Sequence, residues 1–465
     1  MPAQVSMAWV RRYDNGQTNG ERPSAIAVDA AGNVHVTGHS QNAAGGNDCV
    51  TIKYNTDGVE LWRHRDADMA GAALAVDAAG NLYLAGSIRS GTDSDFLTIK
   101  YDGAGNRIWT ARQAAPGSQD WVAEIAVDPA GAVYVTGTSI VGGNREYVTI
   151  KYDASGNVVW VARYANASSP VAIAVDGSGN VFVTGAAATV KYDANGAELW
   201  ASRFNNEGGT ALALDASGNA YVAGYTSGAS GGTDYLTIKH DPAGTALWRR
   251  QWNVGNSDRA EAIGVAGSYV YVTGGAGNYS GALLRSFATL QYSIDGTLRW
   301  ARATYPWYGS AYALATDPAA NVYVTGVVNS QNYRDDFATV KYSPAGDMRW
   351  TIRYHFVQSD GPAIGIRLDA AGNVYVTGQS EGPDMADGTD QDDYATIKYV
   401  QSRFSLGMFC WPWREDPFGR RWRDFLRCLV LPILLIVSMM TFTGMIIRQR
   451  RSSGRTRDAH RSSDP

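Results

Sequence analysis

The composition of the 465-residue chain excludes several classes of protein. Aromatic residues make up 11% of it and its net charge is only −4, whereas disordered chains have few aromatic residues and a high net charge. Its three cysteines are too few for a disulfide framework. Nucleic-acid-binding domains usually carry an excess of basic residues, which this chain lacks, so we expect no nucleic-acid partner.

Residues 8–13 read AWVRRY, and a similar tryptophan-containing segment recurs along the chain. The recurring tryptophans are Trp9, Trp62, Trp109, Trp160, Trp200, Trp248, Trp300 and Trp350. Each later copy ends a longer unit, in which a phrase such as AVDAAGNVYVTG comes first and a phrase such as TIKYD follows. Repetition at an interval of 39 to 52 residues predicts a repeat architecture.

Each unit is expected to form four short strands. The phrases VYVTG and TIKY are rich in Val, Ile, Thr and Tyr and are bounded by Gly, Asn and Asp, as strands and turns are. Val34 and Val36 share one face of their strand, and His35, which is Tyr or Phe in the other units, lies on the opposite face. A small sheet that is covered on both faces and repeated around an axis is a propeller blade.

The glycine of VTG occurs eight times, as does the TIKY phrase, so the sequence predicts an all-β fold, an eight-bladed β-propeller over residues 1–403. The last unit ends at Tyr399 without a tryptophan strand. We expect residues 8–13 to supply that fourth strand and close the ring, which leaves no exposed edge. The fourth unit has the shortest loop; if it were merged with a neighbour, the propeller would have seven blades.

Positions that recur in every unit are expected to build the scaffold. The repeated aspartate, as in Asp29, starts a D-x-x-G-N turn, in which its side chain accepts backbone hydrogen bonds. This role is favoured over a ring of metal ligands. The repeated lysine, as in Lys53, is expected to lie along the neighbouring blade and to reach a carboxylate or water, rather than to bind an anion.

The repeated phrases resemble a known family. The sequence AVDxxGNVYVTG followed by TIKYDxxG resembles the SBBP β-propeller repeat of bacteria over almost all of residues 1–400. The YDxxGxxxW phrase is also similar to the tryptophan-docking repeat of quinoprotein propellers. Such an enzyme would carry adjacent cysteines near its cofactor, whereas Cys49 is the one cysteine of residues 1–403.

Function is expected where the units differ. The connection between VTG and TIKY varies in length from unit to unit, and variable loops on a rigid scaffold often bind ligands. We call the edge of the propeller that carries these loops the variable rim. Aromatic side chains and a histidine there suit sugar or peptide contacts, or pack the loops themselves. The candidate ligand-binding residues are Trp121, Tyr305, Trp307, Tyr308, His355 and Phe356.

An acidic loop over residues 381–393 is the one candidate metal site. Its oxygen ligands could hold Ca²⁺, although their spacing matches no EF-hand, and a solvated acidic loop is the alternative. The candidate ligands are Asp384, Asp387, Asp390, Asp392 and Asp393. No chemistry is assigned to the polar loop near the N-terminus, which contains Asn15 and Glu21.

No HExxH, P-loop or nucleophile elbow occurs in the repeats. The leading hypothesis is therefore a non-catalytic propeller that recognises a protein or glycan ligand on its variable rim. One alternative is an enzyme that hydrolyses or cleaves polysaccharide with carboxylates from different blades. Another is a purely structural module of the envelope.

Residues 428–447 form an apolar segment which, as a helix, would be about 30 Å long, the thickness of a bilayer core. We expect a single transmembrane helix there, after a basic and aromatic linker at 404–427 and before a disordered basic tail at 448–465; a buried core helix is the alternative. Arginines on both sides favour neither orientation. We expect a cell-envelope protein with its propeller outside the cytoplasm, although no signal peptide is visible; a cytoplasmic, tail-anchored body or a truncated start would also fit.

Overall fold

The computed structural model describes residues 4–16, 20–114, 117–165, 167–228, 231–255, 257–277, 286–329, 335–356, 360–381 and 392–402. The segments predicted at 404–427, 428–447 and 448–465 therefore lie outside the described residues. Within the described part of the chain, there is no helix whose length and apolar character would let it span a bilayer. Every element among the described residues is a β-strand, as predicted for residues 1–403.

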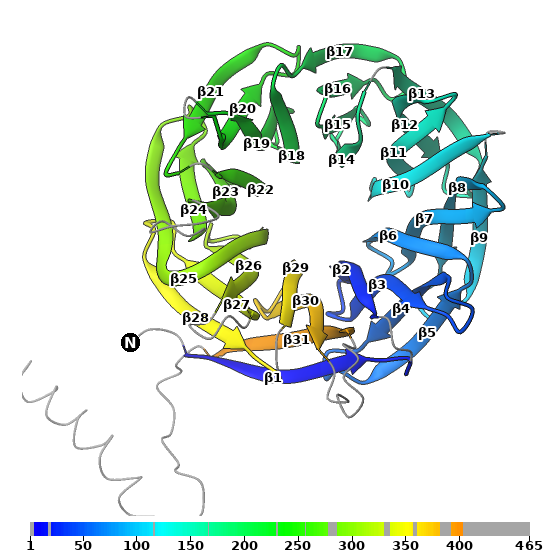
Figure 1. Ribbon diagram of the computed structural model, residues 1–465, viewed down its shortest axis with the longest axis horizontal. Coiled ribbons are helices and arrows are strands. Elements are labelled where there is room, and N and C mark those ends of the chain that lie inside the picture. The colour runs from blue at the N-terminus through cyan, green and yellow to red at the C-terminus, as the bar shows by residue number, and fades with distance from the viewer. Residues whose placement is uncertain are drawn as a thin grey trace, which may run out of the picture. The chain divides into compact units, whose positions relative to one another are not determined.

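The described residues form 31 strands, arranged as a ring in Figure 1. One four-stranded sheet contains β2 (Arg22–Val28), β3 (Val34–Gln41), β4 (Asn47–Tyr54) and β5 (Glu60–Asp66). A second contains β14 (Pro170–Val175), β15 (Val181–Gly185), β16 (Ala188–Tyr192) and β17 (Glu198–Arg203). A third contains β18 (Glu207–Leu214), β19 (Ala220–Ser227), β20 (Thr233–His240) and β21 (Ala246–Trp252).

Each of these four-stranded sheets is an antiparallel meander, in which strands pair in chain order. Two larger sheets each contain more than one such meander. The first contains β6 (Met69–Val76), β7 (Leu82–Ser90), β8 (Asp93–Tyr101), β9 (Arg107–Gln113), β10 (Ser118–Val127), β11 (Val133–Val141), β12 (Asn144–Tyr152) and β13 (Val158–Ala165). In this sheet the parallel pair Gln119–Ser94 links β10 to β8 and so joins the two halves. The second contains β22 (Arg259–Ala266), β23 (Tyr269–Ala276), β24 (Ser286–Ser293), β25 (Leu298–Thr316), β26 (Val322–Asn329), β27 (Asp335–Tyr342) and β28 (Met348–Tyr354). It is continuous because β25 runs from one meander into the next.

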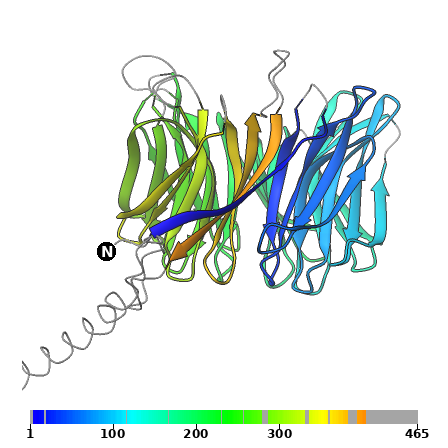
Figure 2. The same cartoon turned by 90° about the horizontal axis from the view of Figure 1, so that it is seen from below.

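The first and last strands of the chain share a sheet. β1 (Gln4–Tyr13) pairs antiparallel with β31 (Asp392–Ser402), beside β30 (Val374–Glu381) and β29 (Asp360–Leu368). The pairing extends from Gln4–Ser402 to Tyr13–Tyr394, so β1 is longer than the segment 8–13 expected from the sequence. Figure 2 shows β1 crossing the side of the ring next to β31.

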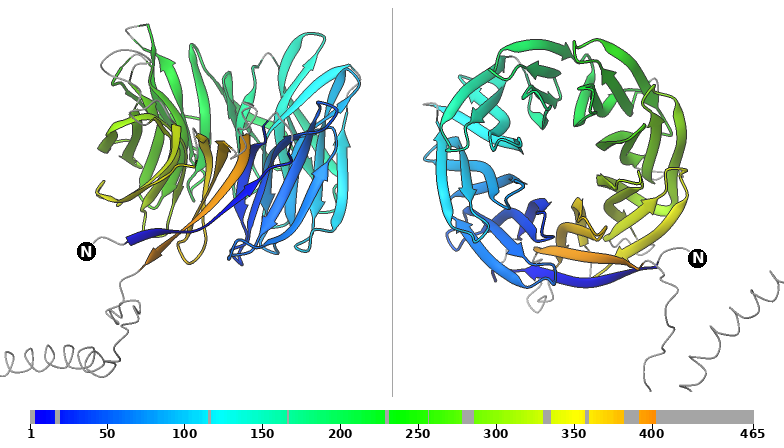
Figure 3. Two further views of the ribbon diagram at one scale, coloured as in Figure 1. Left: turned by 60° about the horizontal axis from the view of Figure 1, so that its bottom comes forward. Right: turned by 180° about the vertical axis from the view of Figure 1, so that it is seen from behind.

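The first strand of each meander lies nearest the axis of the ring, and the later strands lie successively further out (Figures 1 and 3). The inner strand carries a β-bulge beside the VTG glycine: Pro23 pairs with Gly38 and Ala25 with Thr37, so Ser24 is the extra residue between them. A Cβ on Gly38 would overlap the Arg22 carbonyl oxygen. This close approach of two backbones explains why the position is glycine in every unit.

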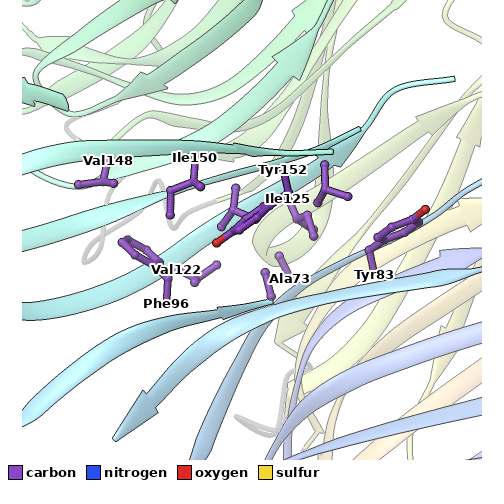
Figure 4. Close-up of a cluster of buried hydrophobic side chains, with 11 residues drawn as sticks. Ala73, Tyr83, Phe96, Val122, Ile125, Val148, Ile150 and Tyr152 are labelled. Atoms are coloured by element: carbon purple, nitrogen blue, oxygen red, sulfur yellow. The ribbon is translucent and has the colours of Figure 1, made fainter. Parts of the chain in front are cut away.

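The hydrophobic core lies between neighbouring meanders. Figure 4 shows one such layer, in which Ala73 and Phe96 from β6 and β8 face residues of β10 and β12. The facing residues include Val122, Ile125 and Ile150, all less than a tenth exposed. Both faces of each sheet are therefore covered, as the alternation of valine and aromatic residues predicts.

The repeated aspartates act in turns, as predicted. Asp29 Oδ1 accepts hydrogen bonds from the amides of Ala31 (3.0 Å) and Asn33 (2.8 Å). In other units the aromatic side chain of the second strand donates to the same carboxylate, as Tyr83 does to Asp77 at 3.0 Å. These carboxylates are occupied by local hydrogen bonds and build the scaffold.

Tryptophan and lysine join each meander to the next. Trp160 packs on Gly196, and its Nε1–H donates to the Ala194 carbonyl at 3.0 Å. Lys151 Nζ donates to the same carbonyl at 3.1 Å. The expected partner of the lysine, a carboxylate or water, is thus wrong for this unit; the ammonium binds a backbone carbonyl of the neighbouring turn. Lys53 follows the same pattern and also lies 3.4 Å from Asp29 Oδ2.

Candidate functional site

The structure separates the predicted ligand-binding residues into groups. Trp121 is 43% exposed on β10 and lines an open pocket of about 170 Å³ together with Arg89 and Ser94. His355 and Phe356 follow β28, in another part of the ring (Figure 1). Tyr305, Trp307 and Tyr308 belong to β25, but their side chains lie outside the described residues.

The structure also divides the predicted metal ligands. Asp393 lies in β31 and is 2% exposed. Asp392 is in the same strand, but its side chain is not described. Asp384, Asp387 and Asp390 lie outside the described residues. The acidic-loop site as a whole therefore stays a prediction, and Asp393 is the one member whose contacts can be given.

A repeated acidic position, which the analysis of the sequence missed, lies at the variable rim. It stands three residues before the TIKY threonine in six units, at Asp48, Asp95, Glu146, Asp234, Asp336 and Asp393. Its partner lies on the fourth strand of the same meander: Arg65 Nε donates to Asp48 at 2.6 Å, and Arg112 Nε donates to Asp95 at 2.7 Å. The interval is 17 residues in both pairs, a spacing that could have revealed them.

A second acidic position lies at the start of the inner strand. Glu21, Glu207 and Asp360 each accept a hydrogen bond from a Ser or Thr on the next strand. Glu207 is also neutralised by Arg249, whose Nη1 is 2.8 Å from its Oε2. In most of these places, therefore, a rim carboxylate has a cationic or hydroxyl partner within its own meander.

The acidic positions on either side of the ring closure form one continuous polar group. We call it the closure cluster; its members are Arg12, Asp14, Glu21, Asp360, Ser380 and Asp393. Arg12 from β1 donates to Asp393 Oδ2 through Nε at 2.9 Å and through Nη2 at 2.8 Å. Its Nη1 donates to Ser380 Oγ at 2.6 Å, and Ser380 in turn donates to Asp360. In the last meander, Arg12 of β1 therefore pairs with the rim carboxylate as Arg65 and Arg112 do in their own meanders.

Two of the predicted ligand-binding residues lie beside the closure cluster. The Arg12 guanidinium lies over the ring of Phe356, 3.9 Å from its centre, and the Phe356 amide donates to Asp360 at 3.1 Å. His355 Nδ1 is 2.8 Å from Asp336 Oδ1. Phe356 is 38% exposed and the His355 side chain is 41% exposed. This part of the rim therefore presents an aromatic ring and an imidazole to solvent above buried charges.

Two groups of acidic and histidine side chains here are close enough to hold a cation. Asp336, His355 and Asp360 offer ligand atoms within 4.8 Å of one another, and so do Asp14, Glu21 and Asp393. Burial raises the pKa of Glu21 to about 7 and the pKa of Asp360 to about 6. Glu21 is 0% exposed and Asp360 is 1% exposed, so neither carboxylate can touch a substrate in this conformation.

The ring of antiparallel meanders, each covered on both faces, is the fold of a β-propeller. Residues 108–144 match the SBBP family model, a β-propeller repeat, which confirms the resemblance seen in the sequence. No curated protein matches the chain.

The chain is similar to several solved structures at low sequence identity. The Dos1 propeller is 9% identical over 86% of this chain and 95% of its own, with a TM-score of 0.51. A eukaryotic initiation factor is 11% identical over 71% of this chain and 78% of its own, with a TM-score of 0.44. A protein of unknown function from Bacteroides caccae is 12% identical over 58% of this chain and 93% of its own, with a TM-score of 0.36.

Proposed function

We propose that the chain is a membrane-anchored, non-catalytic β-propeller that recognises a protein or glycan ligand on its variable rim. The observation that carries this proposal is the exposed pair His355 and Phe356, held against Arg12 at the closure cluster. Aromatic and arginine side chains that lie together on a surface are typical of the residues that dominate binding energy. The buried charges below them hold these side chains in place.

A binding screen tests this proposal. Full-length protein is screened against glycan and peptide arrays, and hits are repeated with His355→Ala/Phe356→Ala. We expect the double variant to weaken binding at least about tenfold, as for residues that carry much of an interface's energy. Ile108→Ala is the control, because Ile108 is 52% exposed on β9, away from the closure cluster. Equal binding by both variants would contradict the assignment of the site.

Eight blades and closure by β1 belong to the same proposal. The support is the number of repeated units in the sequence and the position of β25, whose first half pairs with β24 of one meander and whose second half pairs with β26 of the next. Averaged electron-microscope images viewed along the axis count the blades directly. Seven blades would overturn the assignment of the short fourth unit as a blade.

Membrane anchoring rests on the sequence of residues 428–447, an apolar run with arginines at both ends. Extraction of membranes with alkaline carbonate should leave the full-length chain in the pellet and release a variant that lacks residues 428–447. Protease added to intact cells should digest the propeller if it lies outside the cytoplasm. Complete protection would place it on the cytoplasmic side.

A polysaccharide-cleaving enzyme is the second candidate, because Glu21 and Asp360 have the raised pKa values expected of acid catalysts. Their burial favours the non-catalytic alternative, since a catalytic acid must reach the glycosidic oxygen. Incubation with polysaccharides, followed by an assay of new reducing ends, tests this candidate. Activity that is lost in Asp360→Asn would establish an enzyme.

A further inference from the structure

Three carboxylates meet at the ring closure from segments far apart in the sequence. Asp14 follows β1, Glu21 directly precedes β2 and Asp393 lies in β31. One oxygen from each lies within 4.8 Å of the other two. They meet because β1 pairs with β31 and the chain then turns back into β2, so the group exists only when the ring is closed.

Among the residues that the structure describes, Glu21 has a buried oxygen with no hydrogen-bond partner. Its Oε1 accepts from Ser40 Oγ at 3.1 Å, and Asn15 Nδ2 donates to that same hydroxyl at 2.6 Å. Its Oε2 is shielded from solvent and makes no hydrogen bond to any described residue, and the whole residue is 0% exposed. A carboxylate oxygen buried in this way costs free energy unless a cation or a proton satisfies it.

Glu207 has an arginine partner, whereas Glu21 has no such ion pair among the described residues. Both begin the inner strand of a meander and both accept a hydrogen bond from a Ser or Thr on the next strand. Arg249, which follows the repeated tryptophan, neutralises Glu207. The corresponding residue of the first unit, Arg63, instead binds Glu60 at 2.6 Å.

The net charge of the three carboxylates and their arginine partner favours binding of a divalent cation. Asp393 is compensated by Arg12 at 2.8 Å, whereas no ion pair of Asp14 or Glu21 with an arginine or lysine is found among the described residues. Arg65 attracts Glu21 without a direct ion pair, and it is itself paired with Asp48 at 2.6 Å. Three carboxylates and one guanidinium sum to two negative charges. All three candidate ligands are hard oxygens, the donors preferred by Ca²⁺ over softer metals.

We propose that Asp14, Glu21 and Asp393 bind Ca²⁺ and so tie the connection between β1 and β2 to the last strand of the chain. The site uses Asp393 from the acidic loop that the sequence singled out, but its other ligands come from the N-terminal segment. Because its ligands assemble only on ring closure, Ca²⁺ stabilises the closed ring. The proposal is independent of the ligand on the variable rim and of the membrane anchor.

Calcium titration of the full-length protein tests the proposal, with detergent in the buffer and bound metal first removed by chelation. Calorimetry with CaCl₂ should show one site in the wild type, and Ca²⁺ should raise the melting temperature. Glu21→Gln should weaken Ca²⁺ binding by at least about tenfold, because a charged ligand is lost. It should fold, because it replaces a buried carboxylate by a neutral amide of the same size. Glu207→Gln is the matched control and should bind Ca²⁺ as the wild type does.

A second variant separates this site from the acidic loop. Asp384→Asn/Asp387→Asn/Asp390→Asn keeps Glu21, Asp14 and Asp393 and should retain the calcium site. Binding lost in this triple variant but kept in Glu21→Gln would overturn the proposal in favour of a site in the loop. Absence of Ca²⁺ binding in the wild type would overturn it as well and would leave Glu21 to be satisfied by a proton.

Discussion

At the scale of single residues, the VTG glycine shows how one position fixes the path of the chain. A Cβ on Gly274 would overlap the Arg259 carbonyl oxygen, because the bulge in β22 brings the two backbones together. The conformation of Gly274 itself is ordinary, so the constraint is space and not a positive φ. A methyl group there must push the inner strand away from its neighbour.

Gly274→Ala should therefore lower the free energy of unfolding by about 1–3 kcal/mol, the usual cost of overpacking a core. Gly177→Ala is its control, because nothing lies within 4 Å of the position a Cβ would take and its φ is not positive. We expect the control to change stability by less than about 0.5 kcal/mol. Urea denaturation of both variants measures the difference, and equal stabilities would contradict the steric explanation.

The titration of Glu21 should make the folding stability of the protein depend on pH, and the direction of its pKa shift gives the sign of that dependence. Burial raises its pKa from 4.5 to about 7, and the neighbouring Asp14 and Asp393 carboxylates act in the same direction. Between these values the folded state keeps a proton that the unfolded state has lost, so the stability due to this proton is full below pH 4.5 and falls up to about pH 7.

The comparison of wild type with Glu21→Gln isolates this effect, because Asp360 and the other titrating groups are the same in both. In the presence of EDTA, the stability of the wild type relative to the variant should decline from pH 4.5 to about pH 7 and then level off. Chemical denaturation at a series of pH values measures it. A difference that does not change with pH would mean that Glu21 titrates normally.

At the scale of elements, the strands and turns could be predicted because each is specified within one repeat unit. The D-x-x-G-N turn needs only a carboxylate and amides four residues or fewer away, as in Asp29 and Asn33. The partner of the lysine could not be predicted in this way, because Lys151 and Ala194 are 43 residues apart and meet only when two meanders pack.

The candidate site could likewise be predicted where it depends on local sequence and not where it depends on contacts between distant segments. The aromatic and acidic character of the rim was visible in the sequence at Phe356 and Asp393. Their common partner Arg12 was not, because it is 381 residues from Asp393 and its role depends on the register between β1 and β31. Glu21 was noted as polar without a function, since nothing local indicates that it is buried.

The repeated tryptophan joins neighbouring meanders, and its contribution can be separated from simple aromatic bulk. Trp160→Ala removes a side chain that covers Gly196 and donates to Ala194, and we expect a loss of about 3 kcal/mol. Trp121→Ala removes an equally large side chain that is 43% exposed, and we expect a loss below about 1 kcal/mol. Thermal and urea unfolding of the two variants compare them. Similar losses would show that docking onto the next turn contributes little.

At the scale of the whole propeller, closure rests on β1, because it is the one strand that joins the start of the chain to its end. β1 forms nine residue pairs with β31, and Trp9 donates to the Thr56 carbonyl of the adjoining sheet at 3.0 Å. Arg12 adds the ion pair with Asp393 at the variable rim. The same short segment thus supplies strand pairing, tryptophan docking and charge compensation.

Deletion of residues 1–13 should consequently leave β31 as an exposed edge, which pairs readily with other chains. We expect the shortened protein to form oligomers or aggregates on size-exclusion chromatography and to unfold at a lower temperature. A deletion of residues 1–3, which ends before β1, is the control and should behave as the full-length chain does. A synthetic peptide of residues 4–13 should restore the monomer, because it can occupy the vacant edge. If the shortened protein stays monomeric with an unchanged melting temperature, β1 is not what closes the ring.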